Sequence, residues 1–251
     1  MKSIKLIGFD LDDCLFDSTG LSERARIKGI DAMIDLGLQV DRSKAIQLIN
    51  EIVDEYGSNF SKHYNYFIRR LNQMNNGIEK ISYNSRYKYI AAAVMAYHEE
   101  KVKSIMLYDD VEGCLRKLKN MSIKTSIITD GIPIKQYEKI LRLKIDRLID
   151  LIVISDEIGI RKPNPELFLY WLKKFGIKGQ DAIFVGDRID KDIVPANRNG
   201  INTVYIHRGG KYDIPRVELE TRRSRKPDYD IYSLDELFEV IDDINNKNIK
   251  G

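Results

Sequence analysis

The chain of 251 residues is 43% hydrophobic and 31% charged, which is typical of a globular protein and excludes a disordered or fibrous one. Its 41 Lys and Arg nearly balance 38 Asp and Glu, and the net charge of +3 does not favour a nucleic-acid partner. The two cysteines show no CxxC or Cys/His spacing, so neither a disulfide framework nor a zinc site is expected. No apolar run reaches the roughly 20 residues of a membrane span, and a strand is predicted almost at the first residue. We therefore expect a cytoplasmic protein with no membrane partner and no signal peptide.

The first predicted element is a strand from Lys5 to Asp10, because this apolar run lacks helical periodicity and ends in acidic residues. From about residue 21 to residue 100 the pattern changes, and apolar residues recur at helical spacing, as in Ala45, Ile49 and Ile52. This block predicts three or four helices and no strand. Its tyrosines, around Tyr64, Tyr66 and 83–97, are expected in the core of these helices more than in a substrate pocket.

After about residue 104, short apolar runs alternate with amphipathic helices. Strands are predicted at 125–129, 151–155, 182–187 and 202–206, and helices at 111–121, 134–143, 166–175, 192–199 and 234–244. Such alternation implies βαβ units, and hence an α/β fold with a doubly wound parallel sheet covered on both faces. The charged segment 208–230 is expected to be an irregular connection, in which the basic run Arg222, Arg223, Arg225 and Lys226 is a solvated loop.

Polar residues follow three of the predicted strands. Ligands of parallel sheets bind where the carboxyl ends of the strands meet, so we expect these residues to lie at one edge. Several carboxylates there would repel one another unless a cation neutralises them, and oxygen ligands suit magnesium. A single Asp after a strand is more often a helix cap or turn residue, but the ordered set is not explained in that way. The strand-end residues are Asp10, Asp12, Thr129, Asp130, Gly131, Asp187, Asp190 and Asp192, and Lys162 adds a positive charge between them in the sequence.

Four segments in this order resemble the four motifs of the haloacid dehalogenase superfamily. They are FDLDDCLFD, ITDG, RKPNPELF and GDRIDKDI. The helical block between the first two resembles the helical-bundle cap of one subfamily, which includes phosphoglycolate phosphatase-like and 2-haloacid dehalogenase-like proteins. The resemblance implies a Rossmann-like core of residues 1–18 and 104–251, and a cap domain of residues 19–103.

The resemblance also implies a phosphatase that acts on a small phosphorylated metabolite. Asp10 would be the nucleophile that forms an aspartyl-phosphate, and Asp12 would be the general acid and base. Mg²⁺ would be held by the Asp10 carboxylate, the main-chain carbonyl of Asp12 and the Asp187 carboxylate.

The remaining motif residues would bind phosphate or support the site. Thr129 and the amides of Asp130 and Gly131 match the phosphate-binding turn, and Lys162 would pair with phosphate oxygens and with Asp10. Asp192 and Asp190 would hold metal-bound waters or orient Lys162.

Two positions depart from the family pattern: Cys14 stands where Thr is most frequent, and Asp130 where Asn is frequent. Neither change removes a catalytic group. Cys14 is not expected to be a nucleophile, because no His lies near it in sequence to act as a base. The three histidines lack ligand spacing and are expected at packing or surface positions: His63, His98 and His207.

The sequence is compatible with alternative functions. A phosphomutase would keep all four motifs, and a nucleoside 5'-monophosphate phosphatase would differ only in its substrate. A dehalogenase is disfavoured, because the enzymes of that type lack the second Asp of motif one and need no metal. A non-catalytic binding protein is disfavoured by the intact motif residues. The substrate's identity and the choice between monomer and homodimer are left open.

Overall fold

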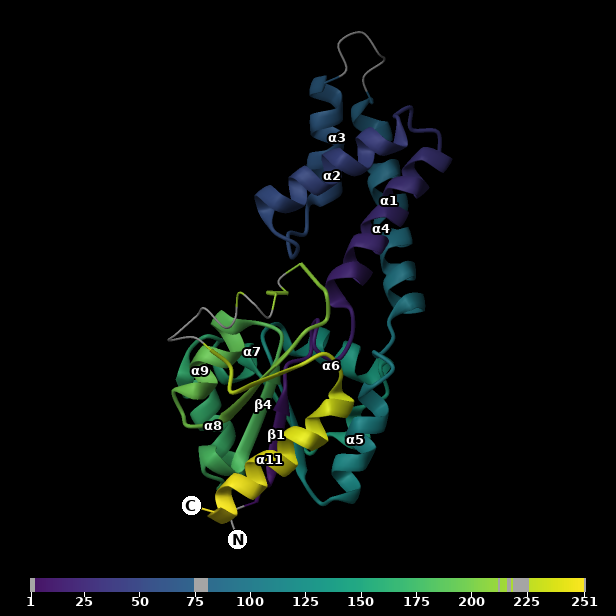
Figure 1. Ribbon diagram of the computed structural model, residues 1–251. Helices are drawn as coiled ribbons and strands as arrows, with labels where there is room; N and C mark the ends of the chain where they lie inside the picture. The colour runs from purple at the N-terminus through teal and green to yellow at the C-terminus, as the bar shows by residue number, and fades with distance from the viewer. Residues whose placement is uncertain (1–2, 75–80, 212, 216–217, 219–225, 251) are drawn as a thin grey trace. The chain divides into compact units, whose positions relative to one another are not determined.

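The computed structural model describes residues 3–74, 81–211, 213–215, 218 and 226–250 (Figure 1). The chain divides into two compact units. One, called here the core unit, comprises Met1–Thr19 and Ile105–Gly251, and the other, the helical unit, comprises Gly20–Ser104. The helical unit is therefore an insertion into the core unit's sequence.

The core unit is built on a six-stranded parallel sheet with the strand order β3-β2-β1-β4-β5-β6. The order runs outward from β1 in both directions, which is typical of a doubly wound sheet with its switch point between β1 and β4. This arrangement confirms the predicted α/β, Rossmann-like class. The strands are β1 (Leu6–Phe9), β2 (Lys124–Thr129), β3 (Leu151–Ile154), β4 (Ala182–Gly186), β5 (Asn202–Ile206) and β6 (Tyr229–Ile231).

Helices cover both faces of this sheet, which is why its inner strands are continuous apolar runs. Figure 1 shows α8 (Pro165–Phe175) and α9 (Val194–Asn197) on one side of the sheet and α5 (Val111–Asn120) and α11 (Leu237–Lys250) on the other. A Cβ at Gly8 would lie 2.7 Å from Cζ2 of Trp171, so the glycine permits α8 to pack closely on β1. The other helical segments are α6 (Pro133–Arg142), α7 (Ser155–Ile158), η1 (Asp146–Leu148), η2 (Gly179–Asp181), η3 (Ile189–Ile193) and η4 (Leu234–Glu236).

The helical unit contains α1 (Ser18–Asp35, which starts in the core unit), α2 (Arg42–Tyr56), α3 (His63–Met74) and α4 (Tyr83–Ser104). It has a hydrophobic core of its own, in which Tyr64 is buried and against which Tyr66, Tyr89 and Tyr97 pack, as predicted, whereas Tyr87 is exposed. In the described part of this unit no strand occurs, which also agrees with the prediction.

Three of the differences from the predicted boundaries have a local structural cause. The segment 208–230 is not irregular throughout, since β6 begins at Tyr229. This strand is short, lies at the sheet edge and carries an Asp in its centre, so it lacks the apolar signature of the inner strands. The predicted strand 151–155 ends one residue early, because Ser155 begins α7. The predicted helix 192–199 begins earlier, in the π-helical turn Ile189–Ile193.

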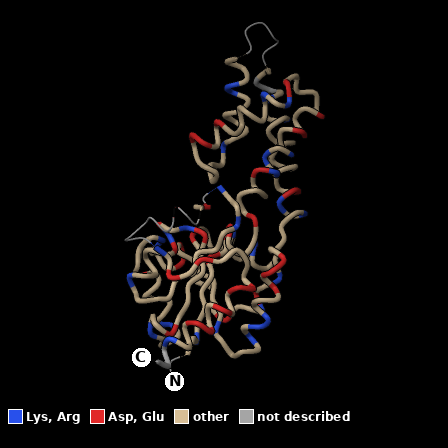
Figure 2. Tube along the Cα trace, viewed as in Figure 1, with Lys and Arg blue, Asp and Glu red and all other residues tan. Residues whose placement is uncertain are grey.

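The charge distribution agrees with the balanced composition. Figure 2 shows basic and acidic residues interspersed along both units. Of the predicted basic loop, Arg222, Arg223 and Arg225 lie outside the described residues. No helix in the part of the chain that the structure describes is long and apolar enough to cross a membrane.

Candidate active site

The site lies at the carboxyl ends of β1 and β4, where the strand order reverses. Asp10 directly follows β1, and its backbone N–H donates a hydrogen bond to Val185 O at 2.9 Å. Asp187 directly follows β4. Because Phe9 of β1 stands opposite Val185 of β4, the two carboxylates leave the sheet at the same edge. Both residues are buried.

A third carboxylate joins these two. Asp10, Asp187 and Asp192 each offer a carboxylate oxygen, and the three atoms lie within 4.8 Å of one another. Asp192 comes from the π-helical turn after β4, and its Oδ2 accepts a hydrogen bond from Arg188 N at 3.0 Å. A Cβ at Gly186 would lie 2.5 Å from the Cβ of Asp192, so only a glycine allows this approach. The turn thus places Asp192 within the carboxylate cluster rather than at its periphery.

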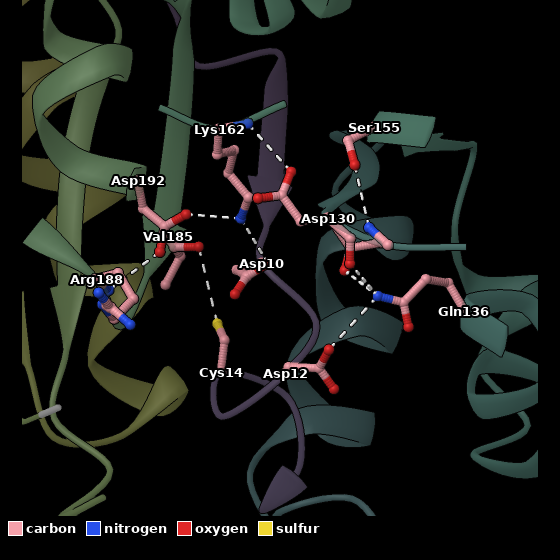
Figure 3. A network of polar contacts seen from close by, with 12 residues as sticks. Asp10, Asp12, Cys14, Asp130, Gln136, Ser155, Lys162, Val185, Arg188 and Asp192 are labelled. Atoms are coloured by element: carbon pink, nitrogen blue, oxygen red, sulfur yellow. Dashed lines mark hydrogen bonds and ion pairs between the residues drawn. The ribbon is translucent and has the colours of Figure 1, made fainter. Parts of the chain in front are cut away.

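Lys162 connects two of the three carboxylates (Figure 3). Its Nζ donates to Asp10 Oδ1 at 2.6 Å and to Asp192 Oδ1 at 2.7 Å. Its backbone N–H donates to Asp130 Oδ1 at 3.1 Å, which ties the motif-three loop to the end of β2. The Lys162 side chain is only 3% exposed, so these ion pairs are shielded from water.

One lysine does not neutralise three buried carboxylates. Burial raises the pKa of Asp10 above the usual carboxyl range, although Lys162 opposes the shift. Burial and the charges of Asp10 and Asp192 also raise the pKa of Asp187. Among the described residues, Asp187 Oδ1 has no hydrogen-bond partner although it is buried. An orphaned carboxylate oxygen in an all-oxygen cluster with excess negative charge fits a hard divalent cation such as Mg²⁺.

The side chain of Asp12 is held away from this cluster, by α6. Lys139 Nζ donates to Oδ1 and Oδ2 of Asp12, both at 2.7 Å, and Gln136 Nε2 lies 3.5 Å from Oδ2. Burial alone would raise the pKa of Asp12, but the charge and hydrogen bonds of Lys139, together with hydrogen bonds from Ser18 and Gln136, outweigh burial and hold the pKa below the usual range. Asp12 is therefore ionised at neutral pH.

The predicted phosphate-binding turn follows β2 at the same edge of the sheet. Thr129 Oγ1 accepts a hydrogen bond from Gln136 Nε2 at 2.9 Å, and Asp130 O accepts one at 2.5 Å. Gly131 has a φ of +135°, which favours glycine, and its N–H donates to Ser155 Oγ at 3.1 Å. The Gly131 amide, which is predicted to bind phosphate, therefore already donates its hydrogen bond to Ser155.

Other residues of interest lie outside this set. Asp190 forms two 3.1 Å hydrogen bonds with Arg188 and its side chain is 59% exposed, which does not match the expected role of orienting Lys162. Cys14 is buried, and burial raises the pKa of its thiol, so it is not a thiolate nucleophile. The two buried histidines are hydrogen-bonded to nearby groups. His63 Nε2 lies 2.9 Å from Gly57 O, and His207 Nδ1 lies 2.8 Å from Asp213 Oδ1.

Three residues of the site were not predicted from the sequence: Gln136, Lys139 and Ser155. Ser155 follows the apolar run of β3, so the rule that found the other strand-end residues also applies to it. Gln136 and Lys139 lie three residues apart on α6, which places them on one helix face. No spacing in the sequence indicates that this face meets Asp12.

Comparisons with known proteins agree with this arrangement. The model of the haloacid dehalogenase-like hydrolase family matches residues 7–206. The chain is 40% identical over 241 residues to a glyceraldehyde 3-phosphate phosphatase of Methanopyrus kandleri, covering 95% of this chain and 97% of the relative. It is 41% identical over 248 residues to the protein of the same name in Pyrococcus furiosus, covering 99% and 97%.

A solved structure shows the same fold. The HAD phosphatase of Thermococcus onnurineus aligns with a TM-score of 0.60 at 21% identity, over 95% of this chain and 98% of that one. The family match spans all four motif segments and most of the chain. The chain therefore belongs to the haloacid dehalogenase-like hydrolase family.

Proposed function

We propose that the protein is a magnesium-dependent phosphatase that hydrolyses a small phosphorylated metabolite through an aspartyl-phosphate on Asp10. The observation that carries the proposal is the buried Asp10 carboxylate, which leaves the sheet beside Lys162 and two further carboxylates. The relatives that match nearly the whole chain are named as phosphatases of glyceraldehyde 3-phosphate. That triose phosphate is the first substrate to test.

In the first half-reaction, a carboxylate oxygen of Asp10 attacks phosphorus. The bond between phosphorus and the leaving oxygen breaks, and its electron pair remains on that oxygen. Asp12, which is ionised in the free protein, first takes a proton from solvent; it then gives this proton to the leaving oxygen, which departs as an alcohol. The positive charge of Lys162 offsets the repulsion between Asp10 and the phosphate oxygens.

The chain offers ligands for both the metal and the phosphate. Asp10, Asp187 and the main-chain carbonyl of Asp12 would hold Mg²⁺, whose chemistry when bound is to neutralise charge on the phosphate and the carboxylates. Thr129, Lys162 and the amides of the motif-two turn would bind the remaining phosphate oxygens. Phosphate binding at the Gly131 amide requires Ser155 Oγ to give up its hydrogen bond.

In the second half-reaction, water attacks the phosphorus of the aspartyl-phosphate. Asp12 takes a proton from this water, and the Asp10 carboxylate leaves as inorganic phosphate forms. The lowered pKa of Asp12 suits this step, because a base must be ionised before it can accept a proton.

The helical unit Gly20–Ser104 is inserted between motifs one and two, where it would act as the cap that selects the leaving group. A phosphomutase would use the same first half-reaction, but the names of the relatives favour transfer to water.

The test is phosphate release from a panel of sugar, triose, hydroxy-acid and nucleoside phosphates, with Mg²⁺ and with a chelator. We expect release that needs Mg²⁺ and is fastest with a small substrate such as glyceraldehyde 3-phosphate. Release that is equally fast with the chelator contradicts the metal dependence. Transfer of phosphate between positions of a sugar, without release, contradicts the phosphatase assignment.

A further inference from the structure

The contact between Asp12 and Lys139 is not explained by the motif residues. Lys139 comes from α6, outside the four motif segments, yet its Nζ lies 2.7 Å from both carboxylate oxygens of Asp12. The side chains are 23% exposed for Lys139 and 31% for Asp12, so this ion pair is partly shielded from water. Two donated hydrogen bonds to one carboxylate restrict its rotation as well as its position.

Asp12 needs such support because the sheet does not position it. β1 ends at Phe9, and Asp12 lies in the loop that follows, where its neighbour Asp13 has a φ of +60°. A side chain on a loop samples several rotamers unless other groups hold it. A carboxyl group that exchanges a proton must lie within hydrogen-bond distance of the reacting oxygen.

α6 is itself tied to the phosphate-binding turn. Gln136 is buried, and its Nε2 donates to Thr129 Oγ1 at 2.9 Å and to Asp130 O at 2.5 Å. Lys139 stands one helical turn further along α6. The helix therefore connects the residues expected to bind phosphate with the residue expected to transfer the proton.

We propose that Lys139 is a positioning residue that holds the carboxyl group of Asp12 where it meets the leaving oxygen of the substrate. The inference rests on the proposed function. Lys139 acts through Asp12, so its removal should slow the breaking of those phosphate esters whose leaving group needs a proton. Its removal should have little effect on the cleavage of esters whose leaving group departs as a stable anion.

Two substrates separate these cases. Glyceraldehyde 3-phosphate would release an alkoxide, which needs a proton as the bond breaks, whereas p-nitrophenyl phosphate releases a stable phenolate. The quantity to compare is kcat/KM, because it covers the steps up to the departure of the leaving group and excludes hydrolysis of the phospho-enzyme.

The variants are Lys139→Met, which keeps the length of the side chain, and Lys139→Arg, which keeps the charge. We expect Lys139→Met to lower kcat/KM for glyceraldehyde 3-phosphate about 100-fold, and that for p-nitrophenyl phosphate by less than about 3-fold. Lys139→Arg should recover most of the loss. The control is Lys135→Met, at an exposed lysine of the same helix, which should change neither value.

Asp12→Asn provides a second check, because it should show the same dependence on the leaving group. Adding Lys139→Met to Asp12→Asn should cause no further loss if the two residues act as one unit. A loss of kcat/KM in the double variant that equals the product of the two single losses overturns the inference. So does a loss in Lys139→Met that is equal for both substrates, because a merely structural role affects both alike.

The activity of the wild-type protein on the two substrates distinguishes a failure of the proposed function from a failure of the role of Lys139. Hydrolysis of neither substrate by the wild type contradicts the proposed function, and the role of Lys139 with it. Hydrolysis of both by the wild type, with an unselective effect of Lys139→Met, leaves the phosphatase standing and refutes the role of Lys139 alone.

Discussion

Lys162 lies between Asp10 and Asp192, with its Nζ 2.6 Å from one carboxylate and 2.7 Å from the other. Burial by itself lowers the pKa of this lysine, but the two carboxylates outweigh that effect and raise the pKa above its usual value. Lys162 is therefore charged whenever the protein is folded near neutral pH. Asp187 is buried beside Asp10 and Asp192. The single positive charge of Lys162 therefore does not balance the three carboxylates, and the cluster keeps an excess of negative charge.

Lys162→Met should both inactivate and destabilise the protein. It leaves two buried carboxylates without their cation, which lowers the free energy of unfolding by about 3–5 kcal/mol. The matched control is Lys124→Met, which removes an exposed pair with Asp150 and should cost less than about 1 kcal/mol. Urea titration followed by circular dichroism measures both. Equal stability of the two variants would contradict the account of the buried pair.

Asp187→Asn should change how stability depends on pH in the metal-free protein. Burial and the neighbouring carboxylates raise the pKa of Asp187 in the folded state. The folded protein then binds more protons than the unfolded one, so the free energy of unfolding falls as pH rises above about 4. Asp187→Asn has no carboxyl group to ionise at this position, so its free energy of unfolding does not fall with pH for this reason. We expect it to be more stable than the wild type at pH 8 by at least about 1 kcal/mol.

The same variant tests the metal site. Mg²⁺ should raise the unfolding temperature of the wild type and have a much smaller effect on Asp187→Asn, because a bound ligand stabilises only the state that binds it. Thermal unfolding between pH 4 and pH 9, with Mg²⁺ and with a chelator, measures both effects. An equal response of the two proteins to Mg²⁺ would place the metal elsewhere.

Much of this site follows from one rule about parallel sheets. Asp10, Thr129 and Asp187 end three apolar runs, and the ends of parallel strands converge, so their proximity is predictable without any coordinates. The family resemblance then identified Lys162. Its side chain does reach Asp10, over a separation of 152 residues.

The contacts of Asp12 and Asp192 were harder to predict. Asp190 and Asp192 stand two residues apart in one acidic segment, and only the π-helical turn after β4 decides that Asp192 faces Lys162 while Asp190 pairs with Arg188. A turn of that type has no sequence signature. Lys139 was missed because the packing of α6 against the loop after β1 brings it to Asp12, and no local pattern records that packing.

The short strand β6 is likewise set by its packing and not by a local sequence pattern. Its three residues are Tyr229, Asp230 and Ile231, which carry no alternating or continuous apolar pattern. They form a strand because β5 offers an unpaired edge, so the neighbouring strand determines the structure more than the segment's own sequence does.

Gly186→Ala tests whether the position of Asp192 matters. The added Cβ would meet the side chain of Asp192 at 2.5 Å, and the turn must shift to relieve the clash. We expect a loss of about 1–3 kcal/mol in the free energy of unfolding, together with reduced kcat, because Lys162 loses one of its two partners. Gly113→Ala, in α5, is the control: apart from its chain neighbours and the backbone of its own helix, nothing lies within 4 Å of the added Cβ, and the change should not destabilise the protein. Full activity in Gly186→Ala would show that Asp192 tolerates displacement.

The central claim is that Asp10 carries the phosphoryl group, and trapping this intermediate tests it most directly. In Asp12→Asn the base for the second half-reaction is missing, so p-nitrophenyl phosphate, whose leaving group needs no proton, should load the enzyme and leave it loaded. The measurement is the mass of the acid-quenched protein in the presence of Mg²⁺, followed by peptide mapping. The account predicts one added phosphoryl group on Asp10, absent when Asp10→Asn is combined with Asp12→Asn. A phosphoryl group on another residue, or one that persists in the double variant, would contradict it.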